Sequence, residues 1–166
     1  MIRRPAVAGQ FYEGRSEQLI KSIESCFLHP LGPGQLPKDV DTHNKREIMA
    51  IVSPHAGYIY SGPVAAHGFL ELWKDRPEPP DTIIIIGPNH HGGIPLATMA
   101  EGGWQTPLGV VEIDSEVANA LIETSKSIKS DEYSHTFEHS IEVQIPFLQY
   151  LYLSLIHISE PTRPLY

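Results

Sequence analysis

Residues 81–93, DTIIIIGPNHHGG, constrain the fold of this 166-residue chain more than any other stretch. The four consecutive isoleucines at 83–86 form a short β-branched run, which is typical of a strand buried on both faces of a parallel sheet. Gly87 and Pro88 end the strand, because proline has no N–H group to donate to a neighbouring strand. His90 and His91 follow at once, at the carboxyl end of the strand, where open α/β sheets build their binding sites.

A second stretch, residues 47–62 (EIMAIVSPHAGYIYSG), repeats this order of apolar strand, proline and histidine. Residues 48–52 form the expected strand, and His55 follows it, 35 positions before His90. Residues 63–73 have helical apolar spacing between the two strands, with a proline suited to a first turn. A helix joining two buried strands predicts a βαβ unit with parallel strands, whose carboxyl ends lie roughly 5 Å apart.

Two imidazoles at neighbouring strand ends can share one ligand, and we predict that His55 and His90 bind a divalent metal ion within about 5 Å of each other. The alternative is that each histidine only donates a hydrogen bond to a loop carbonyl. His91 cannot readily join the pair, because neighbouring residues in an extended backbone point in opposite directions. We therefore predict a substrate-contacting or structural role for His91.

A third cluster, in the sequence EHSIE, contains Glu138, His139 and Glu142. Spacing of four on a helix places both carboxylates on one face, with His139 beside them. We predict that His139 faces the same cavity as the metal pair and carries protons as a general acid or base. The alternatives are a group that supports the ligands and a satisfied structural histidine. His29, His43 and His157 are expected to lie away from this cavity.

The remaining elements follow from local signals. Residues 94–100 and 108–113 predict an antiparallel pair beside the parallel core, and residues 136–151 predict a helix that breaks near Ile145 because of Pro146. Two further helices are expected at residues 17–27 and from Asp114 to about residue 126.

Composition excludes several classes of protein. With 12 basic and 20 acidic residues the net charge is −8, so no basic surface for nucleic acid or anionic membrane is expected. No apolar run reaches the roughly 18 residues of a membrane span, and the N-terminus lacks the apolar core of a signal peptide. The single cysteine, Cys26, excludes an internal disulfide and is compatible with a reducing compartment, so a cytoplasmic protein is expected by default. We interpret Cys26 as a small buried apolar group, the alternative being a reactive thiol or a ligand.

Four separate motifs, in order, resemble the Memo family, called AmmeMemoRadiSam system protein B in bacteria and archaea. They are RPAVAGQFY (4–12), SPHAGYIYSG (53–62), IIIIGPNHH (83–91) and EHSIEVQIPFLQYL (138–151). The resemblance implies a fold similar to the class III extradiol (LigB-like) non-haem iron dioxygenases, with His55 and His90 at two metal-ligand positions. It also implies a functional link to the other AmmeMemoRadiSam proteins. The family's third ligand is a cysteine further along the chain, which Cys26 does not match.

The resemblance covers residues 1–152, which we interpret as the N-terminal part of a single Memo/LigB-like domain. Residues 153–166 resemble translated sequencing-adapter DNA, and we interpret them as a non-native tail. Further strands would be needed to complete the sheet, so we expect an exposed sheet edge or apolar face. With two histidines and no third ligand, we expect weak metal binding.

These observations predict an incomplete three-layer αβα sandwich around a mostly parallel central sheet. The predicted function is a metal-dependent redox or dioxygenase-like activity on an unknown substrate, with iron(II) as the leading metal and copper or zinc as alternatives. His55 and His90 would bind the metal, and His139 and His91 would serve catalysis. The rival hypotheses are a protein that binds a peptide or another partner in the same pocket and a zinc-dependent hydrolase.

Overall fold

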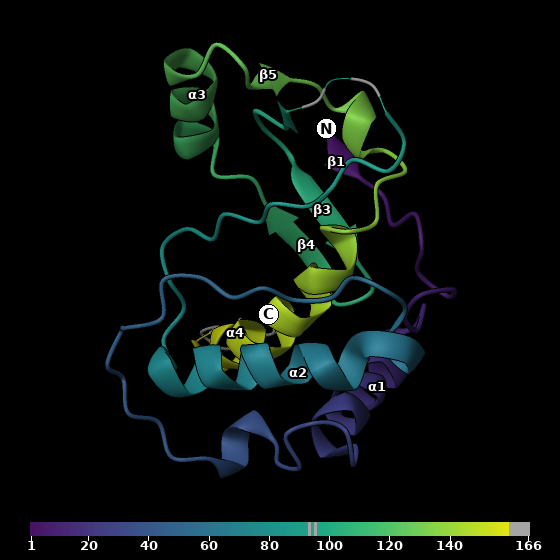
Figure 1. Ribbon diagram of the computed structural model, residues 1–166, viewed down its shortest axis with the longest axis vertical. Helices are drawn as coiled ribbons and strands as arrows, with labels where there is room; N and C mark the ends of the chain where they lie inside the picture. The colour runs from purple at the N-terminus through teal and green to yellow at the C-terminus, as the bar shows by residue number, and fades with distance from the viewer. Residues whose placement is uncertain (93, 95, 160–166) are drawn as a thin grey trace, which may run out of the picture.

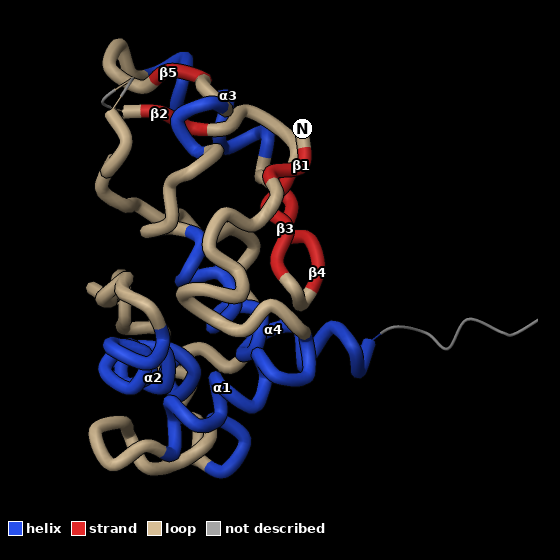
Figure 2. The backbone as a smooth tube through the Cα atoms, turned by 90° about the vertical axis from the view of Figure 1, so that its right-hand side faces the viewer, coloured by secondary structure: helices blue, strands red, loops and turns tan. Residues whose placement is uncertain are grey.

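The computed structural model describes residues 1–92, 94 and 96–159, with side chains described up to Tyr152. Three helices form its main apolar layer: α1 (Ser16–Leu28), α2 (Tyr58–Asp75) and α4 (Ile145–Ser159). Figures 1 and 2 show these helices side by side, with the strands beyond α4. The chain is therefore a mixed α/β protein in which helices supply most of the core.

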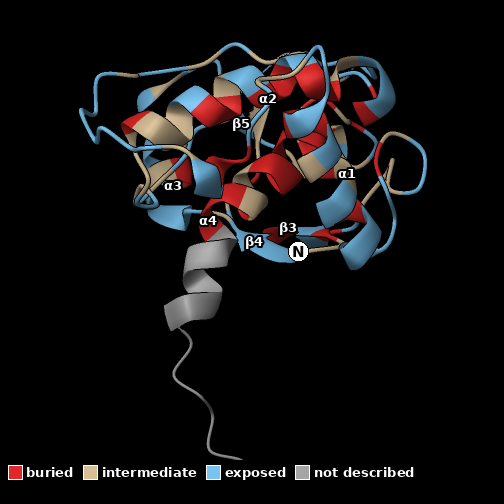
Figure 3. Ribbon diagram, turned by 90° about the horizontal axis from the view of Figure 1, so that it is seen from below, coloured by how far each residue is buried: buried red, intermediate tan, exposed pale blue. Residues whose placement is uncertain are grey.

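Aromatic side chains join the three helices. Phe69 of α2 stacks on Phe147 of α4 with ring centroids 4.8 Å apart, and Phe27 of α1 meets the same ring edge-on at 5.8 Å. All three rings are buried, and Figure 3 shows buried residues, in red, on each of these helices. A Cβ on Gly62 would lie 2.5 Å from Cys26 Sγ, so glycine at this position allows α1 and α2 to approach closely.

Two small sheets lie beyond this helical layer (Figure 1). In the first, β1 (Ile2–Arg3) runs parallel to β3 (Gly103–Thr106), and β3 runs antiparallel to β4 (Gly109–Glu112). In the second, β2 (Ala97–Thr98) pairs in parallel with β5 (Lys129–Ser130). A three-layer sandwich is not confirmed, because these strands do not form one central parallel sheet within the described part of the chain.

The two strands predicted at residues 48–52 and 83–86 are absent, so that part of the prediction is wrong. Neither segment forms a strand with any described residue, and their side chains are not buried on two faces. Val52 is 102% exposed and Ile86 is 89% exposed. The apolar pattern needs flanking strands on both sides, and the described residues provide none. The expectation of an exposed apolar face, by contrast, agrees with this arrangement.

Local signals identified the other elements more accurately. Helix α1 begins one residue before the predicted range, and α3 (Ser115–Thr124) begins after Asp114, whose carboxylate accepts a hydrogen bond from the Val117 N–H. Helix α2 begins at Tyr58, five residues earlier than predicted, so Pro63 lies inside it. The predicted antiparallel pair exists, but the partner of β4 is Gly103–Thr106 and not residues 94–100.

The helix predicted at residues 136–151 begins only where the break was expected: residues 136–141 form no helix. A 3-10 helix covers Glu142–Gln144, and α4 starts at Ile145, with Pro146 in its first turn, where the missing N–H costs nothing. A second 3-10 helix, at Tyr133–His135, precedes it, and a third, Pro37–Asp39, follows α1. The second half of the predicted tail, residues 160–166, lies outside the described residues, and of residues 153–159 only the backbone, at the end of α4, is described.

Asp75, at the end of α2, holds the start of the segment that leads to His55. Its buried carboxylate accepts hydrogen bonds from the N–H groups of Glu47 (3.1 Å) and Ile48 (2.9 Å). Burial alone would raise the pKa of Asp75, but these two N–H groups lower it below its ordinary value. The stability that Asp75 contributes is therefore fully present above its unfolded pKa of about 3.9 and is lost as the pH falls through the folded value.

We expect Asp75→Asn to lower the melting temperature at pH 7 by about 5 °C, because the amide cannot accept both hydrogen bonds as a carboxylate does. The difference from the parent protein should shrink below about pH 4, where the carboxylate becomes protonated. Thermal melts across this pH range test both statements. Asp41→Asn, at an exposed position, is the control. An equal deficit at pH 3 and pH 7 would contradict the electrostatic explanation.

Candidate metal centre

Three histidines from three different loops meet at one place. His55 lies before α2, His90 follows the isoleucine segment, and His139 lies just before the 3-10 helix at Glu142–Gln144. The ring centroids of His55 and His90 are 5.2 Å apart, and those of His90 and His139 are 4.6 Å apart. One ring nitrogen from each residue lies within 4.8 Å of the others.

This spacing is close to what one metal ion requires. Imidazole nitrogens bind zinc or iron at about 2.1 Å, so two ligands of a tetrahedral site lie about 3.4 Å apart. The widest pair, at 4.8 Å or less, would need to close by about 1.4 Å at most to reach this spacing. The side chains of His90 and His139 are 38% and 19% exposed, so a further ligand can approach from solvent.

Two side chains that follow His139 in the sequence hold the loops of His55 and His90. Each of them donates a hydrogen bond to a proline carbonyl in one of these loops. Ser140 Oγ donates to the Pro88 carbonyl at 3.2 Å, and Gln144 Nε2 donates to the Pro54 carbonyl at 3.0 Å. The loop that carries His90 passes so close to Ser140 that a Cβ on Gly87 would lie 2.2 Å from Ser140 Oγ. Hydrogen bonds from residues 140 and 144 therefore hold the loops of His55 and His90 together, without a β-ladder.

Glu138 links His90 to His139. Its buried carboxylate accepts from the His90 backbone N–H at 2.7 Å, from His90 Nδ1 at 2.9 Å, and from the His139 and Ser140 N–H groups at 2.8 Å each. Burial alone would raise the pKa of Glu138, but the His90 and Ser140 donors lower it well below its ordinary value. Glu138 is therefore a carboxylate at neutral pH, directly beside the three imidazoles.

His139 has the environment of a neutral imidazole. Burial, together with the neighbouring His90, His55 and His91, lowers its pKa, and the Glu138 carboxylate opposes this only in part. The Phe11 ring meets it edge-on, with ring centroids 4.9 Å apart. A neutral ring keeps a lone pair that can bind a metal or accept a proton.

The structure therefore brings together three of the four residues that the sequence selected. His55 and His90 converge as the repeated pattern predicted, and His139 faces them. The expectation that this chain offers only two metal-binding nitrogens is revised, because His139 supplies a third within reach. The catalytic role assigned to His139 stays a prediction.

His91 lies outside the group of three. It is exposed, and its ring lies 6.4 Å from that of Phe137. This agrees with the expectation that neighbouring residues diverge, and the catalytic role of His91 stays a prediction. His135, four residues before His139, is buried against the Trp104 ring at 5.7 Å and does not join the group.

The sequence did not reveal that Glu138 contacts His90, 48 positions away. Nor did it reveal that Ser140 and Gln144 contact the proline carbonyls. The available signal was the position of Glu138 directly before His139 in EHSIE, which identified the cluster but not its long-range partner.

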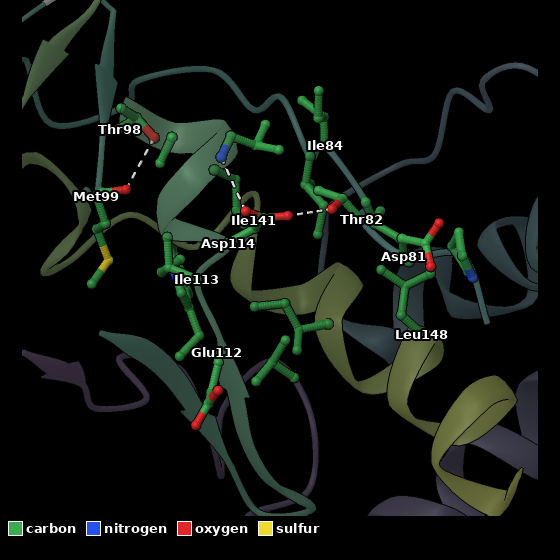
Figure 4. Close-up of a pocket in the computed structure, with 18 of the residues that line it drawn as sticks. Asp81, Thr82, Ile84, Thr98, Met99, Glu112, Ile113, Asp114, Ile141 and Leu148 are labelled. Atoms are coloured by element: carbon green, nitrogen blue, oxygen red, sulfur yellow. Dashed lines mark hydrogen bonds between the residues drawn. The ribbon is translucent and has the colours of Figure 1, made fainter. Parts of the chain in front are cut away.

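A separate apolar cavity of about 380 Å³ lies between the isoleucine segment, β4 and α4 (Figure 4). Ile84, Ile113 and Leu148 line it, and at its rim the Thr82 hydroxyl donates to the Asp114 carboxylate. None of the three converging histidines lines this cavity. The three histidines, unlike this cavity, combine titratable groups, ring nitrogens that could bind a metal, and solvent access.

The sequence pattern that defines Memo-like proteins matches residues 3–159, which is nearly the whole chain. The chain belongs to the Memo family. Similar curated proteins include a MEMO1 family protein of Sulfurisphaera tokodaii, 52% identical over 153 residues, and one of Methanopyrus kandleri, 53% identical over 153 residues. A third, from Thermotoga neapolitana, is 51% identical over 154 residues.

These alignments cover 92% of this chain and 53–54% of each relative. The chain thus spans about half the length of the curated Memo-family relatives it matches. Within the described residues, no helix combines the length and the apolar character needed to cross a bilayer. The three converging histidines all lie within the part that matches the Memo family.

Proposed function

We propose that His55, His90 and His139 bind one divalent metal ion and that this centre serves redox chemistry on a small oxygenated substrate, with iron(II) as the metal. The observation that carries the proposal is the convergence of three ring nitrogens within 4.8 Å, from three separate loops. Three protein ligands with open positions are typical of catalytic metal sites. The family resemblance to extradiol dioxygenases favours iron(II).

A bound iron(II) ion would supply a Lewis acid and a route for electrons between dioxygen and the substrate. The protein's own residues bind the ion and orient the substrate. The three imidazoles hold the ion, and the exposed side of His90 leaves room for the substrate. His91, exposed beside the centre, is positioned to contact an incoming substrate. Glu138 gives the centre a negative charge that offsets part of the charge of the ion.

The second candidate is zinc-assisted hydrolysis. It is favoured by the donor set itself, since three imidazoles and a water molecule form a typical catalytic zinc site, whereas iron(II) oxygenases commonly use two histidines and a carboxylate. Copper also accepts imidazole ligands.

The third candidate, binding of a peptide or other partner without catalysis, uses the same exposed loops. We also propose a cytoplasmic protein that acts together with the other AmmeMemoRadiSam proteins and has no nucleic-acid or membrane partner.

Anaerobic titration with iron(II), zinc(II) and copper(II), followed by calorimetry, tests the centre directly. We expect one equivalent of metal to bind to the parent protein. His67→Ala, at an exposed position of α2, is the control and should not change the affinity. Absence of stoichiometric binding for every metal would overturn the proposal.

Oxygen-electrode measurements on a full-length relative with the same three histidines distinguish the candidates. Oxygen uptake that requires iron(II) supports the redox function. Tight zinc binding without uptake, together with ester hydrolysis, supports the hydrolase and overturns the redox function. Partner binding that does not depend on metal, in the absence of either activity, supports the binding protein instead.

A further inference from the structure

The contacts of Glu138 determine which nitrogen of His90 faces the centre. The carboxylate holds His90 at two points: Oε2 accepts from the backbone N–H at 2.7 Å, and Oε1 lies 2.9 Å from ring Nδ1. A carboxylate cannot donate, so a neutral His90 ring forms this hydrogen bond only with its proton on Nδ1. The lone pair is then on Nε2.

The same carboxylate is also bonded to the segment of His139. Oε1 accepts from the N–H groups of His139 and Ser140, at 2.8 Å each, and the Glu138 carbonyl accepts from the buried Arg3 guanidinium at 2.6 Å. Four donors thus surround the carboxylate, and Arg3 holds the backbone of the same residue. Glu138 is therefore fixed in place and has its acceptor capacity used, which makes it a poor direct ligand for a metal.

We propose that Glu138 is a positioning residue that holds His90 as the Nδ1–H tautomer, so that Nε2 is the nitrogen available to the metal, and that fixes this ring relative to His139. In metal sites, a carboxylate bonded to the non-ligating nitrogen of a histidine orients the ring and raises its basicity. The role of Glu138 in metal binding rests on the metal centre proposed above. The tautomer, however, can be measured in the metal-free protein.

The first measurement is a long-range ¹H–¹⁵N correlation spectrum of the metal-free protein labelled with ¹⁵N-histidine, with the His90 signals assigned from His90→Ala. We expect the neutral His90 ring of the parent protein to carry its proton on Nδ1. In Glu138→Ala the acceptor is gone, and we expect a mixture of tautomers or a predominant Nε2–H form. A predominant Nε2–H form in the parent protein would overturn the inference at once.

The second measurement is metal affinity. We expect Glu138→Ala to weaken divalent-metal binding by roughly 10- to 100-fold, the range for loss of a group that supports a metal ligand. Glu132→Gln is the matched control. This exposed glutamate pairs with the N-terminal amine, at 3.7 Å, so the metal affinity of the Glu132→Gln variant should equal that of the parent protein. A folded Glu138→Ala protein with unchanged His90 tautomer and affinity would contradict the proposal.

Glu138→Gln covers the case in which the alanine variant does not fold. The amide keeps the volume and one oxygen acceptor, so His90 should retain the Nδ1–H tautomer. Its NH₂ group, however, replaces an acceptor of the His90 backbone N–H, and we expect metal binding to weaken by about 10-fold. Unchanged affinity in this variant would overturn the positioning role. If the parent binds no metal but its tautomer depends on Glu138, the metal proposal fails while the tautomer assignment stands.

Discussion

Replacement of His139 by alanine is expected to weaken divalent-metal binding by on the order of 100-fold or more, since it removes one of three ligands and not only a supporting group. The ring of His139 lies 4.6 Å from that of His90 and 5.9 Å from that of His55, and its lowered pKa keeps it neutral. Anaerobic calorimetric titration of the parent and variant proteins measures the effect.

The experiment also decides between the two roles of His139. As a ligand, His139 is needed for affinity, and His139→Ala should resemble His55→Ala and His90→Ala. As a proton carrier, it is needed only for turnover, and the variant would bind metal as tightly as the parent. Equal affinity would therefore contradict the three-histidine centre and support the role predicted from the sequence.

His91→Ala is the matched control for this comparison, because it lies in the same loop as His90 but outside the group of three. We expect its metal affinity to stay within about twofold of the parent, since it removes no ligand. A loss as large as that of His90→Ala would mean that His91, and not His139, completes the site.

The sequence predicted the convergence of His55 and His90 from a pattern whose structural basis turned out to be different. The prediction assumed two neighbouring parallel strands, whereas in the structure Ser140 and Gln144 hold the two loops through the carbonyls of Pro88 and Pro54. Contacts between positions 52 and 90 apart depend on the tertiary fold, and no local signal predicts them. The same holds for the contact of Glu138 with His90.

Elements with local signals were predicted well. Helix α1 is defined by its apolar period, α3 by the Asp114 cap and the start of α4 by Pro146. The isoleucine segment has an equally strong local signal, but a strand also needs hydrogen-bonding neighbours, and the described residues place none beside it. Its exposed apolar side chains show that β-propensity alone does not form a sheet.

The second large effect is expected for Glu142, the other glutamate of EHSIE. This fully buried carboxylate pairs with the Arg3 guanidinium and accepts from the N–H groups of Ala6 (2.9 Å) and Val7 (3.1 Å) and from the Tyr12 hydroxyl (2.6 Å). Arg3 in turn donates to the His135 carbonyl at 2.9 Å. This network joins the N-terminal segment to the loop that carries His139.

We expect Glu142→Ala to lower the free energy of unfolding by about 3–5 kcal/mol, because it leaves a buried guanidinium without its counter-charge. This corresponds to a fall in melting temperature of about 10 °C or more for a domain of this size. Urea unfolding followed by circular dichroism measures the loss. Glu132→Ala removes only an exposed ion pair and should cost less than about 1 kcal/mol.

The double variant Arg3→Met, Glu142→Leu separates the charge effect from the loss of hydrogen bonds. Removing both charges leaves no buried guanidinium without a counter-charge. The double variant should therefore lose less unfolding free energy than the single variants Arg3→Met and Glu142→Leu lose together. It should not recover fully, because the N–H groups of Ala6 and Val7 still lack their acceptor. Losses that simply add would show that Arg3 and Glu142 stabilise the fold independently, and would contradict the ion pair as the source of the large effect.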